Sequence, residues 1–353
     1  SSDIFQNGTA TGLTWTLTTS DNITFNLAAS GMNATSTVIP SIPSTKVKDT
    51  FGNDNAASTS TDNTVSYDVT VPTLSFSSIS PASPASSLMP TVYGTASKPS
   101  TVTLYYDSGC STAKSAASAN TVFAMPGIAL TANVNSNTST AIFGKAADSL
   151  GNVSICTPLT SYTHDGTSPT VTNVTAVHGD GIFKAGELIP IKVTFSEAVT
   201  VTGTPRMTLE TGAVDAVVNY TSGSGTAELT FNYTVFAGDT TSDLDYGSTT
   251  ALALNGGTIV DHVGNVATIT LPTVGGAASI AGQKAIVIDT TAPSLSYTSI
   301  SPASPSNNLT PAVSLSLSEA ASDVRLYSDA SCSSAISNAA AGSSGANTIT
   351  TNT

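Results

Sequence analysis

Carboxylate side chains recur at regular places in this sequence, and carboxylate oxygens are ligands that divalent cations such as calcium prefer. One set belongs to the phrase Asp-x-Thr-x-Pro, which begins at Asp68, Asp165 and Asp289. Each copy follows a strand-like run, and successive copies are about 100 residues apart. A phrase that recurs at this period in a β-rich chain indicates a joint between domains.

A second phrase, Asp-x-x-Gly-Asn, begins at Asp49, Asp148 and Asp261, and each copy precedes a copy of the first. Its chemistry is that of a hairpin turn, in which the Asp side chain caps backbone N–H groups and Gly adopts a positive φ. Turn capping is therefore one interpretation of these carboxylates, and cation binding is the other. In both cases a repeat ends in a turn, a last strand and a joint.

The joints divide the chain into four segments, which we call repeats one to four: 1–70, 71–167, 168–291 and 292–353. Repeats two and four are of the same type, because "LYYDSGCSTA" in repeat two matches "LYSDASCSSA" in repeat four. We expect repeat one to lack its first strands and repeat four its last strands. Cys332 then occupies the place of Cys110, and the counterpart of Cys156 is expected after residue 353.

Short runs with a period of two residues fill the repeats. "LIPIKVTFSE" and "KAIVID" in repeat three are examples, and Gly, Asn, Asp and Ser separate such runs. Repeats of about 100–125 residues with about seven short strands predict a two-sheet antiparallel sandwich.

These residues resemble a known family. Repeat three, which runs from "GDGIFKAGELIPIKVTFSE" to "IVDHVGNVATITL", resembles the bacterial immunoglobulin-like (Big-type) repeats of very large secreted adhesins. Repeat one, with "VKDTFGNDNAASTSTDNTVSYDVTVP", resembles another repeat type of such proteins, and repeats two and four resemble a shorter relative with a cysteine. The resemblance implies an all-β fold of tandem Ig-like antiparallel β-sandwiches in an elongated array. It also implies an extracellular stalk with calcium at its joints.

The expected topology gathers carboxylates at the two poles of repeat three. In an Ig-like sandwich the last turn and the loop after the second strand lie at the pole where the chain enters. Calcium takes six to eight oxygen ligands, and a cluster of carboxylates repels itself without a cation. The candidate calcium ligands are Asp165, Glu197 and Asp261 at one pole, and Asp180, Glu187, Asp239, Asp243, Asp245, Asp289 and Glu319 at the other.

One position distinguishes the joints. When repeats two and four are aligned from Pro90 and Pro311, Lys98 falls where repeat four has Glu319. An ammonium group at this place can replace a cation by pairing with Asp68 or Asp148. We therefore expect the joint between repeats one and two to bind no metal.

The chain has three cysteines. Cys110 and Cys156 fall in the same repeat, and a disulfide between them fits the acidic, Ser/Thr-rich composition of a protein from an oxidising compartment. A pair of free cytosolic thiols is the alternative.

The composition argues against several functional classes. The net charge is −13, with ten Lys plus Arg, whereas a nucleic-acid-binding protein needs a basic face. No apolar run approaches the ~20 residues that span a bilayer. The histidines His164, His178 and His262 lie at separate joints or turns, and none has a Cys or another His at metal-ligand spacing. No Gly-rich phosphate loop is present. We therefore expect that the chain is not an enzyme.

The leading functional hypothesis is a structural stalk of a bacterial repeat adhesin or surface fibre, extracellular or on the cell surface. It would hold a distal adhesive element away from the cell. The alternative is a filament subunit, in which the incomplete end repeats of different copies complete each other by β-strand addition. A binding module built on the loops of repeat three is a third hypothesis. The expected partners are neighbouring repeats or further copies of the chain.

Overall fold

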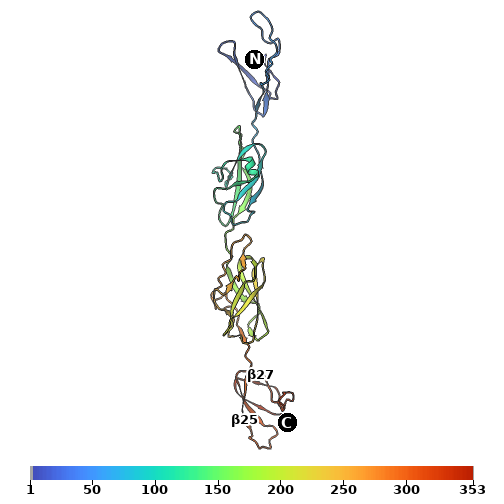
Figure 1. The fold of residues 1–353 in the computed structure, drawn as a ribbon, viewed down its shortest axis with the longest axis vertical. Coiled ribbons are helices and arrows are strands. Elements are labelled where there is room, and N and C mark those ends of the chain that lie inside the picture. The colour runs from blue at the N-terminus through green and yellow to red at the C-terminus, as the bar shows by residue number, and fades with distance from the viewer. Residues whose placement is uncertain (1–2, 353) are drawn as a thin grey trace. The chain divides into compact units, whose positions relative to one another are not determined.

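The computed structural model describes residues 3–352, and its regular secondary structure is almost entirely β-strand (Figure 1). Its only helix in these residues, α1 (Asn120–Ala124), has five residues, far fewer than a membrane span requires. The predicted all-β class is confirmed. The chain forms two compact units: one runs to Thr167 and includes Val263–Asn265, and the other comprises Ser168–His262 and the residues from Val266 onward. The division into four repeats remains a prediction, and we use the repeat names below only for residue ranges.

Repeat one contains short antiparallel pairs and a small core. Its strands pair as β1–β5, β2–β3 and β4–β6. They are β1 (Phe5–Gln6), β2 (Thr14–Thr19), β3 (Phe25–Ser30), β4 (Ser36–Val38), β5 (Pro40–Ser41) and β6 (Val65–Tyr67). Few of its apolar side chains are buried, and Val38 is one of these few. The β2–β3 hairpin exposes Leu17 and Phe25.

Repeat two consists of two sheets that share one core. The first sheet has the order β11-β8-β7 and the second β10-β9-β12-β13. The strands are β7 (Leu74–Ser80), β8 (Thr91–Ala96), β9 (Ser100–Tyr105), β10 (Ser118–Ala119), β11 (Ile128–Ala129), β12 (Ser139–Asp148) and β13 (Thr157–Thr163). Alternate residues point into the core, as Val102 and Leu104 do from β9 and Ile142 from β12. Phe123 of α1 closes one side, and a Cβ at Gly94 would lie only 2.3 Å from its ring, so this position requires glycine.

Repeat three contains the largest core and two sheets. The larger sheet has the order β14-β16-β19-β18-β17-β21, with β22 and β23 paired beside this path; the smaller has the order β15-β24-β20. The strands are β14 (Val171–Ala176), β15 (Gly181–Phe183), β16 (Leu188–Thr202), β17 (Arg206–Glu210), β18 (Ala216–Ser222), β19 (Thr226–Thr234), β20 (Thr240–Thr241), β21 (Asp245–Tyr246), β22 (Leu252–Ala253), β23 (Thr258–Val260) and β24 (Ile286–Asp289). One pair departs from the predicted antiparallel arrangement: β15 and β24 are parallel, with Ile182 opposite Val287.

Repeat four has a three-stranded sheet, β25-β26-β29, and a separate pair, β27–β28. The strands are β25 (Leu295–Ser301), β26 (Ala312–Leu317), β27 (Ala321–Val324), β28 (Ala340–Gly342) and β29 (Gly345–Thr350). Its core is small and is formed around Leu315, Leu317, Val324 and Ile349.

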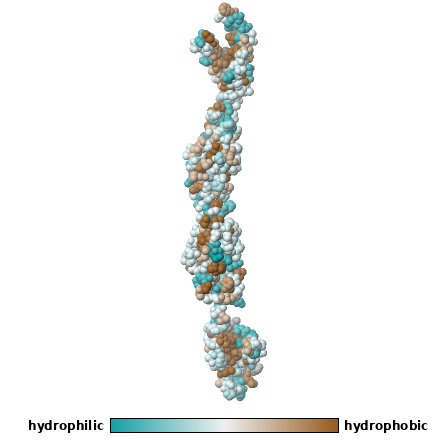
Figure 2. Space-filling model, in the orientation of Figure 1, coloured by the Kyte–Doolittle hydropathy of each residue, from teal (hydrophilic) through white to brown (hydrophobic). Residues whose placement is uncertain are grey.

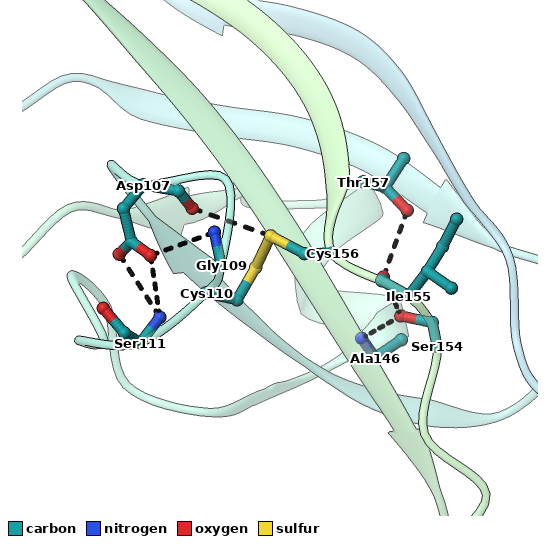
Figure 3. The surroundings of a disulfide bond; sticks show 9 residues. All are labelled: Asp107, Gly109, Cys110, Ser111, Ala146, Ser154, Ile155, Cys156 and Thr157. Atoms are coloured by element: carbon teal, nitrogen blue, oxygen red, sulfur yellow. Dashed lines mark hydrogen bonds between the residues drawn. A yellow bond between two sulfur atoms is a disulfide. The ribbon is translucent and has the colours of Figure 1, made fainter.

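Cys110 and Cys156 form a disulfide, as the sequence predicts (Figure 3). Cys110 lies in a tight loop with a positive φ of 49°, and the Asp107 carboxylate holds this loop by accepting hydrogen bonds from the backbone N–H groups of Gly109 and Ser111. The bridge ties this loop to the segment between β12 and β13. Such a bond is typical of an oxidising compartment.

We expect this disulfide to stabilise repeat two substantially. The two cysteines are 46 residues apart, and in the chain-entropy estimate closure of such a loop contributes roughly 3–4 kcal/mol to the free energy of unfolding. Replacement of both residues by Ser should therefore lower the urea concentration at which half of repeat two is unfolded. Hydrogen exchange of residues 92–104 monitors this unfolding. Cys332→Ser is the control, because Cys332 is a free thiol on the surface, and it should leave that midpoint unchanged.

Candidate functional site

The joint between repeats one and two is organised around one ammonium group. The Nζ atom of Lys98 lies 2.8 Å from a carboxylate oxygen of Asp68 and 2.7 Å from one of Asp148. It also donates a hydrogen bond to the carbonyl oxygen of Thr70. The sequence predicted that Lys98 pairs with Asp68 or Asp148, and the structure confirms both pairs.

Three strand ends bring these residues together. Asp68 follows directly after β6, and Lys98 lies in the two-residue interval between β8 and the Pro99 that precedes β9. Asp148 is the last residue of β12 and lies opposite Ser100 in the antiparallel β12–β9 pair. Because a strand pair fixes which residues are opposite each other, this register sets the Asp148 carboxylate beside Lys98.

The Asp-x-x-Gly-Asn phrase is a turn that its own Asp side chain caps. Asp148 accepts hydrogen bonds from the backbone N–H groups of Leu150 and Asn152, both at 2.9 Å, and Gly151 has a φ of 87°. In the first copy Asp49 caps its turn in the same way. The capping interpretation is therefore correct for these two copies, and Asp148 also serves the joint.

The Asn that ends this phrase has a role that the sequence interpretation missed. The Asn152 side-chain amide donates to the carbonyl oxygen of Asp68 at 3.0 Å, and the Asn265 amide donates to that of Asp165 at 3.2 Å. Each turn therefore holds the backbone of the preceding Asp-x-Thr-x-Pro phrase. The presence of Asn as the fifth residue in all three copies was the available signal.

A pair of hydrogen bonds fixes the residue after each joint proline. Ser97 donates its N–H to the carbonyl oxygen of Thr73 at 3.0 Å, and the Thr73 N–H donates to the Ser97 hydroxyl at 2.9 Å. The same exchange recurs between Ser196 and Thr170, and between Ser318 and Ser294. The residues that follow these serines are Lys98, Glu197 and Glu319, so the three positions are structurally equivalent.

The charged side chains at the first joint are partly buried and compensate one another's charge. The Asp148 side chain is only 4% exposed and that of Lys98 20%. The hydrogen bond from Lys98 is the main cause that holds the pKa of both Asp68 and Asp148 well below the ordinary value of 3.8. In return, Asp148 first and Asp68 second raise the pKa of Lys98 above 10.5.

At the predicted calcium pole of repeat three, two carboxylates lie close together. One oxygen of Glu197 and one of Asp261 are within 4.8 Å of each other, and Asp261 is 3% exposed. The third predicted ligand, Asp165, accepts a hydrogen bond from the N–H of Thr167 at 3.1 Å. It lies three residues before Ser168, where the second compact unit begins.

The other predicted cluster of repeat three does not converge. Residues 3–352 contain no group of three acidic side chains drawn from this set that could share an ion. Instead, single carboxylates cap nearby backbone: Asp180 accepts from the N–H of Ala285, and Glu187 from that of Lys184.

The aspartates of the 239–245 loop have similar capping roles. Asp239 accepts hydrogen bonds from the Tyr233 hydroxyl and the Phe236 N–H. Asp243 accepts one from the N–H of Ile286, and the buried Asp245 accepts one from that of Gly275. Nearby donors in the folded loops therefore engage Asp239, Asp243 and Asp245, which the sequence assigned to a metal.

Asp289 and Glu319 line one cleft, as the sequence predicted for the next joint. Thr240, Thr241, Ile288 and Ser318 also line it. Asp289 accepts a hydrogen bond from the N–H of Thr291. The Oε1 atom of Glu319 is buried and has no hydrogen-bond partner among the described residues. A buried carboxylate oxygen without a donor is costly, so this position favours a cationic partner.

Neither a scan against protein-family models nor a search of curated proteins finds a match to this chain.

We predict that Lys98→Glu makes the first joint depend on calcium. The substitution removes the shared cation and leaves three carboxylates facing one another, so hydrogen exchange of residues 148–152 should become faster without calcium and slower again when calcium is added. The wild-type residues should show no such response. Lys192→Glu is the matched control, because Lys192 forms a solvent-exposed pair with Glu228 in repeat three. A calcium response in the wild-type joint would contradict the prediction.

The same charges predict the pH range over which the first joint is stable. The stability contributed by Asp68 and Asp148 is complete above pH 3.8 and is lost as the pH falls through their lowered pKa values, because the unfolded chain takes up protons first. The stability contributed by Lys98 is complete below pH 10.5 and is lost as the pH rises through its raised pKa. Urea unfolding measured from pH 7 to pH 2 should show that the free energy of unfolding of repeat two falls at acidic pH. The free energy of unfolding of the Lys98→Met variant should fall less over this pH range. Equal falls in the variant and the wild type would contradict the assignment of the pH dependence to the Lys98 ion pairs.

Proposed function

We propose that this chain is a structural stalk of tandem Ig-like β-sandwiches, extracellular or on the bacterial cell surface, that carries an adhesive element at a distance. The observation that carries the proposal is the recurrence of one joint device: a serine and the residue after a proline exchange two hydrogen bonds at Ser97, Ser196 and Ser318. A protein whose task is mechanical needs the same joint many times, whereas a catalytic site is needed once.

The joint device limits bending by holding the linker backbone. The prolines of the three phrases fix their own φ angles and restrict the residue before them. The Asp of each phrase then caps the linker, as Asp68 does for the N–H of Thr70 at 2.8 Å. The Asn152 amide holds the carbonyl of Asp68 from the other side. A linker with both its donors and its acceptors engaged has few alternative conformations.

Calcium is proposed for the two later joints. Glu197 and Asp261 would hold one ion, and Asp289 and Glu319 would hold another. Carboxylates are hard oxygen ligands that suit calcium, and the bound ion would neutralise the acidic groups that face it. At the first joint Lys98 supplies the positive charge from the chain itself.

A head-to-tail filament assembled by β-strand complementation is the second candidate function. The observation that favours it is strand β27, which pairs with β28 on one edge and with no described strand on the other. Such an unpaired edge is a template for strand addition.

Small-angle X-ray scattering tests the stalk. A compact chain of 353 residues has a radius of gyration of about 20 Å, and we expect at least about twice that value in calcium. Removal of calcium should lower it, because unneutralised joints bend. Glu319→Lys, which introduces the charge of the first joint at the last, should reduce this change.

A radius of gyration near that of a compact chain would contradict the stalk proposal. A radius that is large but unaffected by calcium removal would contradict only the calcium sites. A radius that grows with protein concentration would favour the filament.

A further inference from the structure

Strand β14 is the outermost strand of the larger sheet of repeat three. The sheet order begins with β14, which pairs with β16 alone among the described strands. An edge strand presents backbone N–H and C=O groups with which another chain can pair, and a charged side chain or a proline on the strand often prevents this. The six residues of β14, "VTNVTA", include neither. Its edge therefore needs another form of protection.

A segment that repeat two lacks lies along this edge. After the Asp-x-x-Gly-Asn turn, repeat two reaches its last strand through residues 153–156, whereas repeat three takes residues 266–285 to do so. Within this longer segment we call residues 268–283 the strap. At its start, the N–H of Thr268 donates to the carbonyl oxygen of Pro169, just before β14, at 2.8 Å.

The other end of the strap occupies the hydrogen-bonding groups that β14 turns away from β16. The N–H of Val174 donates to the carbonyl oxygen of Ala278 at 2.9 Å, and the carbonyl oxygen of Val174 accepts a hydrogen bond from the Gln283 amide at 3.1 Å. The strap therefore takes the place of a neighbouring strand, although none of its residues belongs to a strand.

The amide nitrogen of Gln283 is the main polar link between strap and strand. Besides the carbonyl oxygen of Val174, it lies 2.8 Å from the Oδ1 atom of Asn173 and 2.9 Å from the carbonyl oxygen of Ser279. One side chain therefore connects the strap both to itself and to β14.

Apolar anchors and a close backbone contact hold the strap in this position. Leu271 and Ile280 are buried in the core of repeat three. Between them the strap folds back on itself, and a Cβ at Gly282 would lie only 1.8 Å from the carbonyl oxygen of Gly276. Only glycine at position 282 allows this approach, so a larger residue there would force the strap open.

We propose that the strap covers an interaction surface, the outer edge of β14, and that the partner it excludes is β14 of a second copy of the chain. Both groups at the centre of this edge belong to Val174. Two β14 strands related by a two-fold axis can therefore exchange both hydrogen bonds between their Val174 residues. No like charges oppose this pairing, because β14 carries no charge. The inference concerns repeat three alone and does not depend on the stalk proposal.

The surface is a backbone edge and not an apolar patch. Figure 2 shows apolar side chains on the part of the chain that Figure 1 draws in yellow. On β14, however, Val174 points into the core, so the side chains that alternate with it, Asn173 and Thr175, lie on the outer face and are polar. Backbone hydrogen bonds therefore hold the pair and set its register. With Val174 opposite Val174, Asn173 of one copy lies opposite Thr175 of the other.

Release of the strap tests whether it covers the edge. Gln283→Ala removes the side-chain bonds to β14, and Gly282→Val forces the strap open by an independent cause. In either variant of the complete chain, at low protein concentration, the Val174 amide should exchange hydrogen at least about fivefold faster than in the wild type. Asn232→Ala is the control, because Asn232 is exposed on β19, which β16 separates from β14, and it should change nothing.

Protein concentration then tests the pairing. At high concentration the released variants should form dimers in sedimentation velocity, and exchange of residues 171–176 should slow again as the dimer fraction rises. The wild type and Asn232→Ala should show no such slowing at these residues. Continued slow exchange of residues 207–209, in the buried part of β17, shows that the variants remain folded.

Cysteine cross-linking tests the register. All proteins carry Cys332→Ser, which removes the free thiol, and Gln283→Ala, which releases the strap. Copies with Asn173→Cys should form a disulfide with copies that carry Thr175→Cys faster than either type does with itself.

Each result bears on one part of the proposal. Unchanged exchange of the Val174 amide in both released variants would overturn the covering role of the strap. Faster exchange without dimers would overturn the interaction surface, and so would dimers in which residues 171–176 stay unprotected. Equal cross-linking of like and unlike copies would overturn the register.

Discussion

The hydrogen-bond exchange between a serine and the residue after a proline is the interaction on which the joints depend. A linker that enters a sheet must satisfy its first donor and acceptor, and at all three joints one serine does both. This exchange fixes the backbone beside the next residue, which is Lys98 next to Asp68 at the first joint and Glu319 in one cleft with Asp289 at the last. That next residue is an ammonium at the first joint and a carboxylate at the other two, and on this difference the calcium proposal rests.

Much of this structure was predictable from local patterns, because the interactions concerned lie close together in the sequence or repeat along it. The alternating runs predicted the β-strands, the Asp-x-x-Gly-Asn phrase predicted capped turns at Asp49 and Asp148, and the alignment of repeats two and four predicted the role of Lys98. The cysteine placement predicted the disulfide.

The remaining features depend on tertiary contacts that alternation does not encode. A run such as "KAIVID" predicts a strand but not its neighbour, so the parallel pairing of β24 with β15 was missed. Asp180 and Asp243 were assigned to a shared ion, yet each accepts a backbone N–H from the segment before or at the start of β24. The hold of Asn152 on Asp68 spans 84 residues. Only the folded loops determine which donors reach these carboxylates.

The parallel pair β15–β24 has a mechanical consequence. One strand lies near the beginning of repeat three and the other at its end, so tension along the chain pulls the two strands in opposite directions. In a parallel pair this force acts along the strands and loads their hydrogen bonds together in shear, instead of opening them one by one as in an unzipped hairpin. Resistance to stretching at this pair therefore follows from strand direction, and it adds to that of the antiparallel β14–β16 pair, through which a pull from the N-terminal side enters repeat three.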